Sequence, residues 1–134
     1  MTYKLRQKER DALLNTPDSA RYKYSIGRIA DWQEVWSLHG STGWVLAGSP
    51  ESGESIPVWP HRDFAQIFAV GEWNATTPKG IGLADWLDKW IPGLMRDGRS
   101  VTVFPVAIST GLHGIKVSPE RFRDDLSEEL SRIE

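Results

Sequence analysis

The spacing of hydrophobic residues changes along the chain and predicts helices at both ends with strands between them. Apolar residues recur every three or four positions in residues 4–31 and 119–134, which is the period of helices that bury one face. This helical period is lost in residues 34–39, which are strand-like, and residues 101–108 are apolar on both alternating sets, which is typical of strands. The pattern therefore predicts an α+β protein.

Residues 56–71 are the stretch around which we expect the fold to be organised. Residues 56–59 are strand-like and stop at Pro60, which has no N–H to donate to a neighbouring strand. Three apolar residues between positions 64 and 68 then follow the helical period, and Gly71 is expected to end that helix. A strand that leads directly into a helix start is therefore predicted here.

The remaining segments complete the expected order αα-βββ-α-α-ββ-α. Glycines at 40 and 43 predict a hairpin, residues 71–80 are expected to be a loop, and residues 83–97 are expected to form a helix that ends at Gly98. We therefore expect one domain over residues 1–134. It should contain about five strands in a largely antiparallel sheet covered by helices, with the N-terminal helical segment 4–31 packed on it.

Two later elements are expected to be buried. The strand at 101–108 should lie inside the sheet or be buried at a subunit contact, with a bulge or an unpaired position at Pro105 because proline cannot complete a ladder. The final helix should cover the sheet, since Phe122, Leu126 and Leu130 lie on one helical face. Its removal is therefore expected to unfold the chain.

Local signals predict the starts of two helices and one site where a helix packs closely against a neighbour. Thr16 before Pro17 and Ser118 before Pro119 are expected N-caps, because each offers a hydroxyl to the first free amides of a helix. Gly27 lies in mid-helix, where glycine is unfavourable, and so is expected to mark close packing against a neighbour.

Composition limits the cellular setting and the chemistry. The 134 residues include no cysteine, which excludes disulfides and thiolate metal sites. No apolar run reaches the ~18 residues of a membrane span, and the N-terminus has no apolar signal region. We therefore expect a soluble cytoplasmic protein. The net charge of −2 disfavours nucleic acid, although residues 1–30 carry seven Lys or Arg against three Asp or Glu.

Several short motifs together resemble a known family. They are W-x-x-V-W at 32–36, V-W-P-H at 58–61, G-E-W at 71–73 and V-F-P at 103–105. In their order and spacing, the chain resembles the bacterial domain-of-unknown-function 2750 family from about residue 13 to residue 130. The resemblance implies a small stand-alone bacterial protein, and it brings no established activity or catalytic residue.

Catalytic and metal-binding patterns are weak. The histidines His39, His61 and His113 are too scattered for common metal-ligand spacing, and we expect no metal, cofactor or catalytic residue. One alternative is that the chain is a small hydrolase or a ligand-binding enzyme that uses His61, Asp63 and His113. A weaker alternative is nucleic-acid binding through the basic N-terminal segment.

Tryptophan content is the better functional signal. Of seven tryptophans, Trp86 and Trp90 follow a helical stripe and are expected in the core, whereas the other five lie near element ends and turns. Because tryptophan is enriched in binding hot spots, we interpret the chain as a non-catalytic adaptor or immunity-like interaction domain. The expected partner is another protein or a peptide, with a homodimer left open and no membrane involved. The candidate binding residues are Trp36, Trp44, Trp59, His61, Arg62, Asp63 and Trp73.

Overall fold

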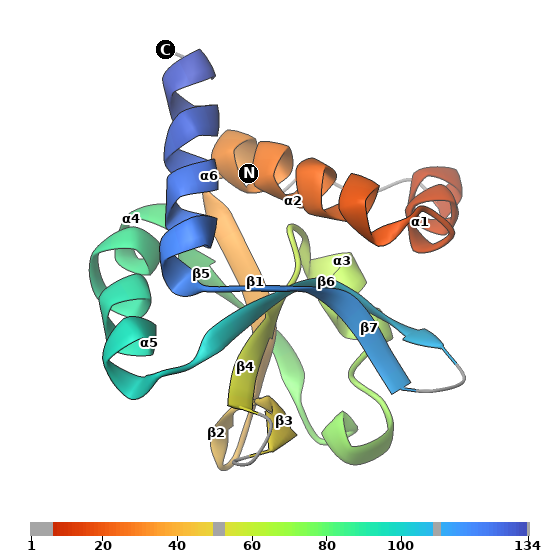
Figure 1. The fold of residues 1–134 in the computed structure, drawn as a ribbon. Helices are drawn as coiled ribbons and strands as arrows, with labels where there is room; N and C mark the ends of the chain where they lie inside the picture. The colour runs from red at the N-terminus through yellow and green to blue at the C-terminus, as the bar shows by residue number, and fades with distance from the viewer. Residues whose placement is uncertain (1–6, 50–52, 109–110, 134) are drawn as a thin grey trace.

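The computed structural model describes residues 7–49, 53–108 and 111–133, and it contains two small β-sheets with helices packed against them (Figure 1). Helices α1 (Gln7–Leu14) and α2 (Asp18–Trp32) precede the strands, and α6 (Pro119–Ile133) follows them and packs against α2. Shorter helical segments lie between strands: α3 (Arg62–Ile67), the 3-10 turn η1 (Gly71–Trp73), α4 (Leu83–Asp85), the π-helical turn η2 (Trp86–Trp90) and α5 (Ile91–Asp97).

The strands form two sheets that meet at one backbone bridge. The three-stranded sheet has the order β2 (Gly43–Trp44), β1 (Glu34–Gly40), β5 (Thr77–Gly82), and all its pairs are antiparallel. The four-stranded sheet has the order β3 (Ala47–Ser49), β4 (Gly53–Val58), β6 (Ser100–Ile108), β7 (Gly111–Val117). Trp36 and Trp59 exchange backbone hydrogen bonds of 2.9 and 2.8 Å, which join β1 to the end of β4.

The expected α+β class is confirmed, but the expectation of a single sheet of about five strands is wrong. The segment expected to be a loop at 71–80 contains most of β5, which pairs with β1 from Thr77 opposite His39 to Gly82 opposite Glu34. The sequence of β5 has little β-propensity of its own, so the strand depends on its backbone pairing with β1. The pairing of β4 with β6 is also parallel, because a long crossover connects them.

Strand β6 lies inside its sheet between β4 and β7, as expected. Val103 and Phe104 are fully buried, and the register shifts between Val103 and Val106, which confirms the bulge at Pro105. At the bulge Phe104 has a φ of 49°, a left-handed conformation that is uncommon for a residue with a side chain. Across from it, a Cβ on Gly114 would lie 2.8 Å from the Val103 carbonyl oxygen, so only glycine fits.

Helix α6 buries the face that its sequence predicts. Phe122 and Leu126 are fully buried, and the helix contacts α2, α5 and β6. The Ser118 hydroxyl accepts a hydrogen bond of 3.1 Å from the Arg121 amide, which confirms the expected cap. None of the helices in the described ranges combines the length and apolarity needed to cross a membrane.

Three local expectations are wrong. The Thr16 hydroxyl donates to the Ala12 carbonyl at 2.7 Å, so it closes α1, and α2 begins at Asp18 without a side-chain cap. A Cβ on Gly27 would meet no atom within 4 Å, so this glycine marks open space and not close packing. Helix α3 ends at Ile67, and Gly71 instead begins η1 with a φ of 60°.

A buried arginine connects α2 to the bulge in β6. Arg21 is 3% exposed, and its Nε donates to the Phe104 carbonyl at 3.2 Å. Its two terminal nitrogens donate to the Thr16 carbonyl and the Asp18 carboxylate. Because burial penalises the guanidinium charge, the pKa of Arg21 is lowered from its ordinary value. The side chain therefore holds the start of α2 against the one strained residue of β6.

Candidate functional site

Trp59 begins the predicted junction between strand and helix, residues 59–63, and it belongs to the core. Its side chain is fully buried, its Nε1 donates to the Pro105 carbonyl at 3.2 Å, and its ring stacks on Phe68 with 5.7 Å between centroids. These contacts join the end of β4 to the β6 bulge and to α3. Trp59 therefore presents no surface to a partner in this structure.

His61 is also buried, and its ring serves the backbone of α3. It is 4% exposed, and its Nδ1 accepts a hydrogen bond of 3.1 Å from the Asp63 amide as the N-cap of the helix. The Asp63 carboxylate lies 3.8 Å from the same nitrogen. In a catalytic histidine–aspartate pair that nitrogen carries a proton and donates a hydrogen bond to the carboxylate. Here Nδ1 accepts from the backbone, so the geometry is that of a cap.

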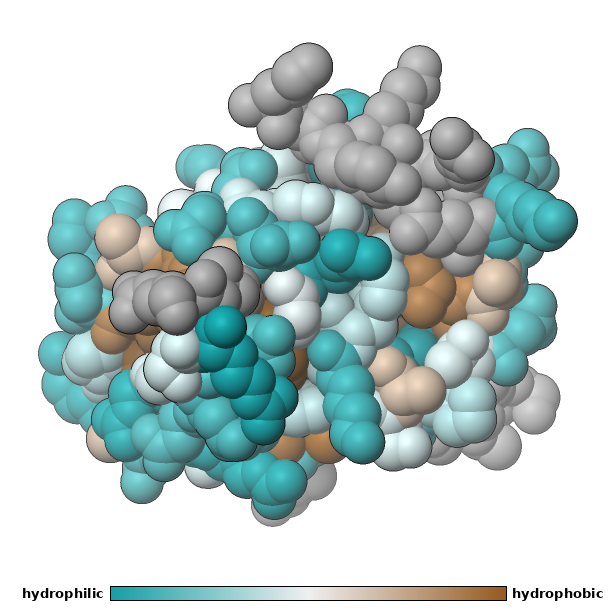
Figure 2. All heavy atoms as spheres, turned by 90° about the horizontal axis from the view of Figure 1, so that it is seen from above, coloured by the Kyte–Doolittle hydropathy of each residue, from teal (hydrophilic) through white to brown (hydrophobic). Residues whose placement is uncertain are grey.

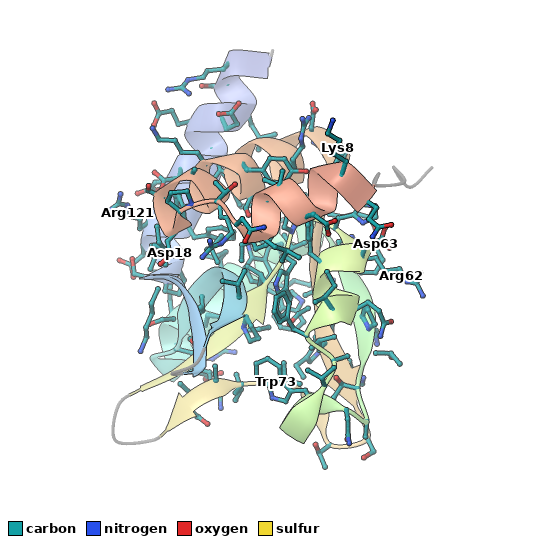
Figure 3. All side chains as sticks on the ribbon, turned by 90° about the vertical axis from the view of Figure 1, so that its right-hand side faces the viewer. Lys8, Asp18, Arg62, Asp63, Trp73 and Arg121 are labelled. Atoms are coloured by element: carbon teal, nitrogen blue, oxygen red, sulfur yellow. The ribbon has the colours of Figure 1, made fainter. Side chains whose placement is uncertain are left out.

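The predicted binding residues do not gather in one surface patch. Arg62 is exposed, and Figure 3 shows Arg62 and Asp63 at the start of α3, well apart from Trp73. Trp36 is partly buried, and its ring lies so close to Gly80 that a Cβ there would be 3.1 Å from it. The side chain of His113, the third member of the enzyme hypothesis, lies outside the described residues.

Two tryptophans from separate elements meet at the surface instead. Trp44 on β2 and Trp90 on η2 are both partly exposed, and their rings pack edge to face with 4.8 Å between centroids and an angle of 86°. Trp90 also stacks on buried Trp86 at 5.8 Å, and Trp86 packs edge-on against Phe122. A continuous aromatic path thus runs from the surface to α6. We call Trp44 and Trp90 the tryptophan pair.

The π-helical turn η2 places the second member of this pair. The Ile91 amide donates to the Trp86 carbonyl, one residue further back than in an α-helix. Pro92 follows at once and has no N–H for the usual helical bond, which accounts for an irregular turn at this position. The wider turn stacks Trp86 and Trp90, with one ring buried and the other partly exposed. Such turns occur frequently at functional sites.

Polar side chains lie beside Trp44, and a shallow hollow lies beside Trp90. His39 packs edge-on against Trp44 at 5.0 Å, and the Lys79 ammonium lies 5.6 Å from the centre of the Trp44 ring. A hollow of about 210 Å³ adjoins Trp90 and is lined also by Lys89, Gly93, Leu94, Asp97 and Arg99. The pair therefore combines apolar rings, a nearby cation and a depression.

A larger groove of about 560 Å³ lies between α2 and α6. Tyr22 and Ile26 line it from α2, and the Tyr22 hydroxyl donates to the Asp125 carboxylate of α6. Burial, this hydrogen bond and the Asp125 charge together raise the pKa of Tyr22. The arginines of α6 are paired with acidic side chains of the same helix.

From above, over α1 and α2, the surface is mostly hydrophilic, with small hydrophobic areas (Figure 2).

Sequence reasoning found Trp44 but missed its contact with Trp90. The helical stripe placed Trp90 in the core, but its ring is only partly buried and contacts Trp44 of β2, which comes from another part of the chain. Pro92, which predicts an irregular turn directly after Trp90, was the one local signal of an unusual position. In the described part of the chain, no three His, Cys, Asp or Glu side chains gather as a metal site requires.

Comparison with known proteins defines the family. The model of the family described as Protein of unknown function (DUF2750) matches residues 22–126, a range that includes Trp44, Lys79 and Trp90. Searches of curated proteins and of solved structures found no match. Since the family match covers well over half of the chain, this protein is a member of the DUF2750 family.

Proposed function

We propose that this chain is a non-catalytic interaction protein that binds another protein or a peptide through the tryptophan pair. The observation that carries the proposal is the contact between Trp44 and Trp90, two partly exposed indoles supplied by a hairpin strand and a π-helical turn. The Trp90 ring is held against the core because it stacks on buried Trp86, and the Trp44 ring packs against Trp90 and His39.

The energetics of indole burial support this proposal. Tryptophan removes a large area from water and loses little rotamer freedom on binding, so it is enriched in the residues that dominate interface affinity. Rings already held by the fold lose still less on association. Covering the tryptophan pair would therefore contribute more to affinity than covering the charged surface around it.

The geometry at the predicted junction favours this interpretation over the hydrolase alternative. The His61 ring is buried and accepts from the Asp63 amide, so its Nδ1 is engaged in helix capping. A general base needs a nitrogen within reach of a substrate proton. No observation at His61 supplies that arrangement.

Affinity capture from extracts of the native cell tests the proposal. Wild-type protein should retain a partner that Trp44→Ala loses, because the substitution removes half of the tryptophan pair. Trp73→Ala is the matched control, since Trp73 is also partly buried but belongs to η1. Arg62→Ala tests the predicted junction through its exposed residue.

Circular dichroism and urea unfolding should first show that each variant is folded. Lys79→Glu serves as a second variant at the same surface, because Lys79 is exposed and its replacement leaves both rings in place. Retention of the partner by both Trp44→Ala and Lys79→Glu would contradict the proposal. Loss only with Arg62→Ala would move the binding surface to the start of α3.

A further inference from the structure

We propose that the tryptophan pair binds an extended, proline-rich segment of a partner protein that carries an acidic side chain beside its prolines. This inference rests on the proposed function and names the chemistry of the partner. It depends on three observations: the angle between the two rings, the residues at the neighbouring sheet edges, and one lysine that forms no ion pair with any described residue.

The two rings form a corner suited to a flat, apolar ring. Trp44 and Trp90 are nearly perpendicular, at 86°, and the hollow of about 210 Å³ continues from Trp90 past Gly93 and Leu94. A Cβ on Gly93 would meet only the end of the Arg96 side chain at 3.6 Å, so the absence of a side chain keeps this hollow open. Proline-rich segments dock on aromatic surfaces of this kind with their pyrrolidine rings.

The sheet edges beside the tryptophan pair argue against a partner that adds a strand. Strand β2 is only two residues long, and β5, at the other edge of the same sheet, contains Pro78 and Lys79. Proline removes a donor from that edge, and lysine is a common means of blocking strand addition. A partner here must be held by side-chain contacts. Polyproline II segments, which make no internal hydrogen bonds and are already extended, bind in this way.

Charge around the tryptophan pair favours an acidic partner. Lys79 is exposed and, among the described residues, forms no ion pair; its ammonium lies over the Trp44 ring at 5.6 Å. The cations that line the hollow are paired: Lys89 lies 3.5 Å from Asp85, and Arg99 lies 3.5 Å from Glu54. A carboxylate on the partner would therefore meet Lys79 without breaking an existing pair. Its attraction would also draw the ammonium away from Trp44 and uncover that ring.

Titration with synthetic peptides tests the inference. The first probe is a blocked peptide of prolines with one central glutamate. In the second, every proline is replaced by serine, and in the third the glutamate is replaced by lysine. The readout is the indole N–H signals in nitrogen–proton NMR spectra of the full chain, with Trp44 and Trp90 assigned by single Trp→Phe variants.

The proline–glutamate peptide should shift the indole signals of Trp44 and Trp90, and the serine peptide should bind at least about tenfold more weakly. Lys79→Glu should weaken binding of the glutamate peptide by about tenfold and strengthen binding of the lysine peptide. These two results together would support the inference, because a purely structural tryptophan pair would respond to neither change.

The remaining outcomes overturn the inference without deciding the proposed function. Equal binding of the serine peptide would refute the proline requirement, and equal binding of the lysine peptide would refute the acidic requirement. If no peptide shifts either indole signal, the inference is wrong even where Trp44→Ala loses a captured partner. In that last case the interaction function stands with a different partner chemistry.

Discussion

Replacing Arg21 by methionine should destabilise the protein by about 2–4 kcal/mol. Methionine retains an unbranched apolar side chain but donates no hydrogen bond. It leaves the buried Phe104 carbonyl without the Nε donor that now lies 3.2 Å away. It also leaves the Thr16 carbonyl without its guanidinium partner.

The structure indicates how much each lost contact of Arg21 contributes to this destabilisation. An unsatisfied buried acceptor costs about 1–3 kcal/mol, and the Phe104 carbonyl belongs to a fully buried residue. Thr16 is partly exposed, so water can replace part of its lost bond. The Asp18 side chain is 47% exposed, and its ion pair with Arg21 should contribute less than about 1 kcal/mol. Removing the guanidinium also removes the cost of burying its charge, which offsets part of the lost stability.

Urea unfolding followed by tryptophan fluorescence measures this loss. Arg21→Met should lower the midpoint at an unchanged slope, and Asp18→Asn is the matched control that removes only the exposed ion pair. Arg21→Lys should fall between wild type and Arg21→Met, because an ammonium cannot reproduce the planar fork of donors. A loss below about 1 kcal/mol for Arg21→Met, or an equal loss for Asp18→Asn, would refute the role assigned to the Phe104 carbonyl.

Three further predictions concern other elements. Gly27→Ala should stabilise the protein by about 0.5–1 kcal/mol in urea unfolding, because the new Cβ enters open space in mid-helix; destabilisation would show a contact at this position. Gly114→Ala should destabilise it by about 1–3 kcal/mol, since the Cβ would lie 2.8 Å from the Val103 carbonyl oxygen; wild-type stability would show that the bulge can yield. Above about pH 10 the unfolded chain releases the Tyr22 proton while the folded chain retains it, so wild type should lose stability relative to Tyr22→Phe. That loss should stay below about 1.4 kcal/mol per pH unit because Tyr22 releases a single proton, and parallel pH profiles of the two proteins would contradict the raised pKa.

Elements with a strong local pattern could be predicted from the sequence. Residues 101–108 are apolar on both faces and form the interior strand β6, and Ser118 caps a helix whose apolar residues are correctly spaced for burial. Strand β5 could not be predicted in the same way. Its Thr77-Pro78-Lys79-Gly80 segment lacks β-propensity, and its ladder depends on β1, which lies more than thirty positions earlier in the chain.

Candidate binding residues were harder to predict because exposure is a tertiary property. Trp59 stands next to a proline at an element end, yet Phe68 and the Pro105 carbonyl enclose it. Trp90 stands on a regular apolar stripe, yet its ring reaches the surface beside Trp44. In both cases the deciding contact comes from another segment, so position along the chain could not separate core indoles from surface ones.

The parallel pairing of β4 with β6 has a consequence for synthesis of the protein on the ribosome. Roughly forty residues separate Val58 from Ser100, so this pairing closes a long loop before its contacts can compensate for the lost entropy. Strands β1, β2 and β5 can pair once Gly82 has emerged, whereas β4 gains its central partner only when β6 has emerged. Helix α6 completes the cover later still. The nascent chain therefore exposes the apolar face of β4 until most of its length has been translated, and this interval is when it is most exposed to aggregation and to chaperones.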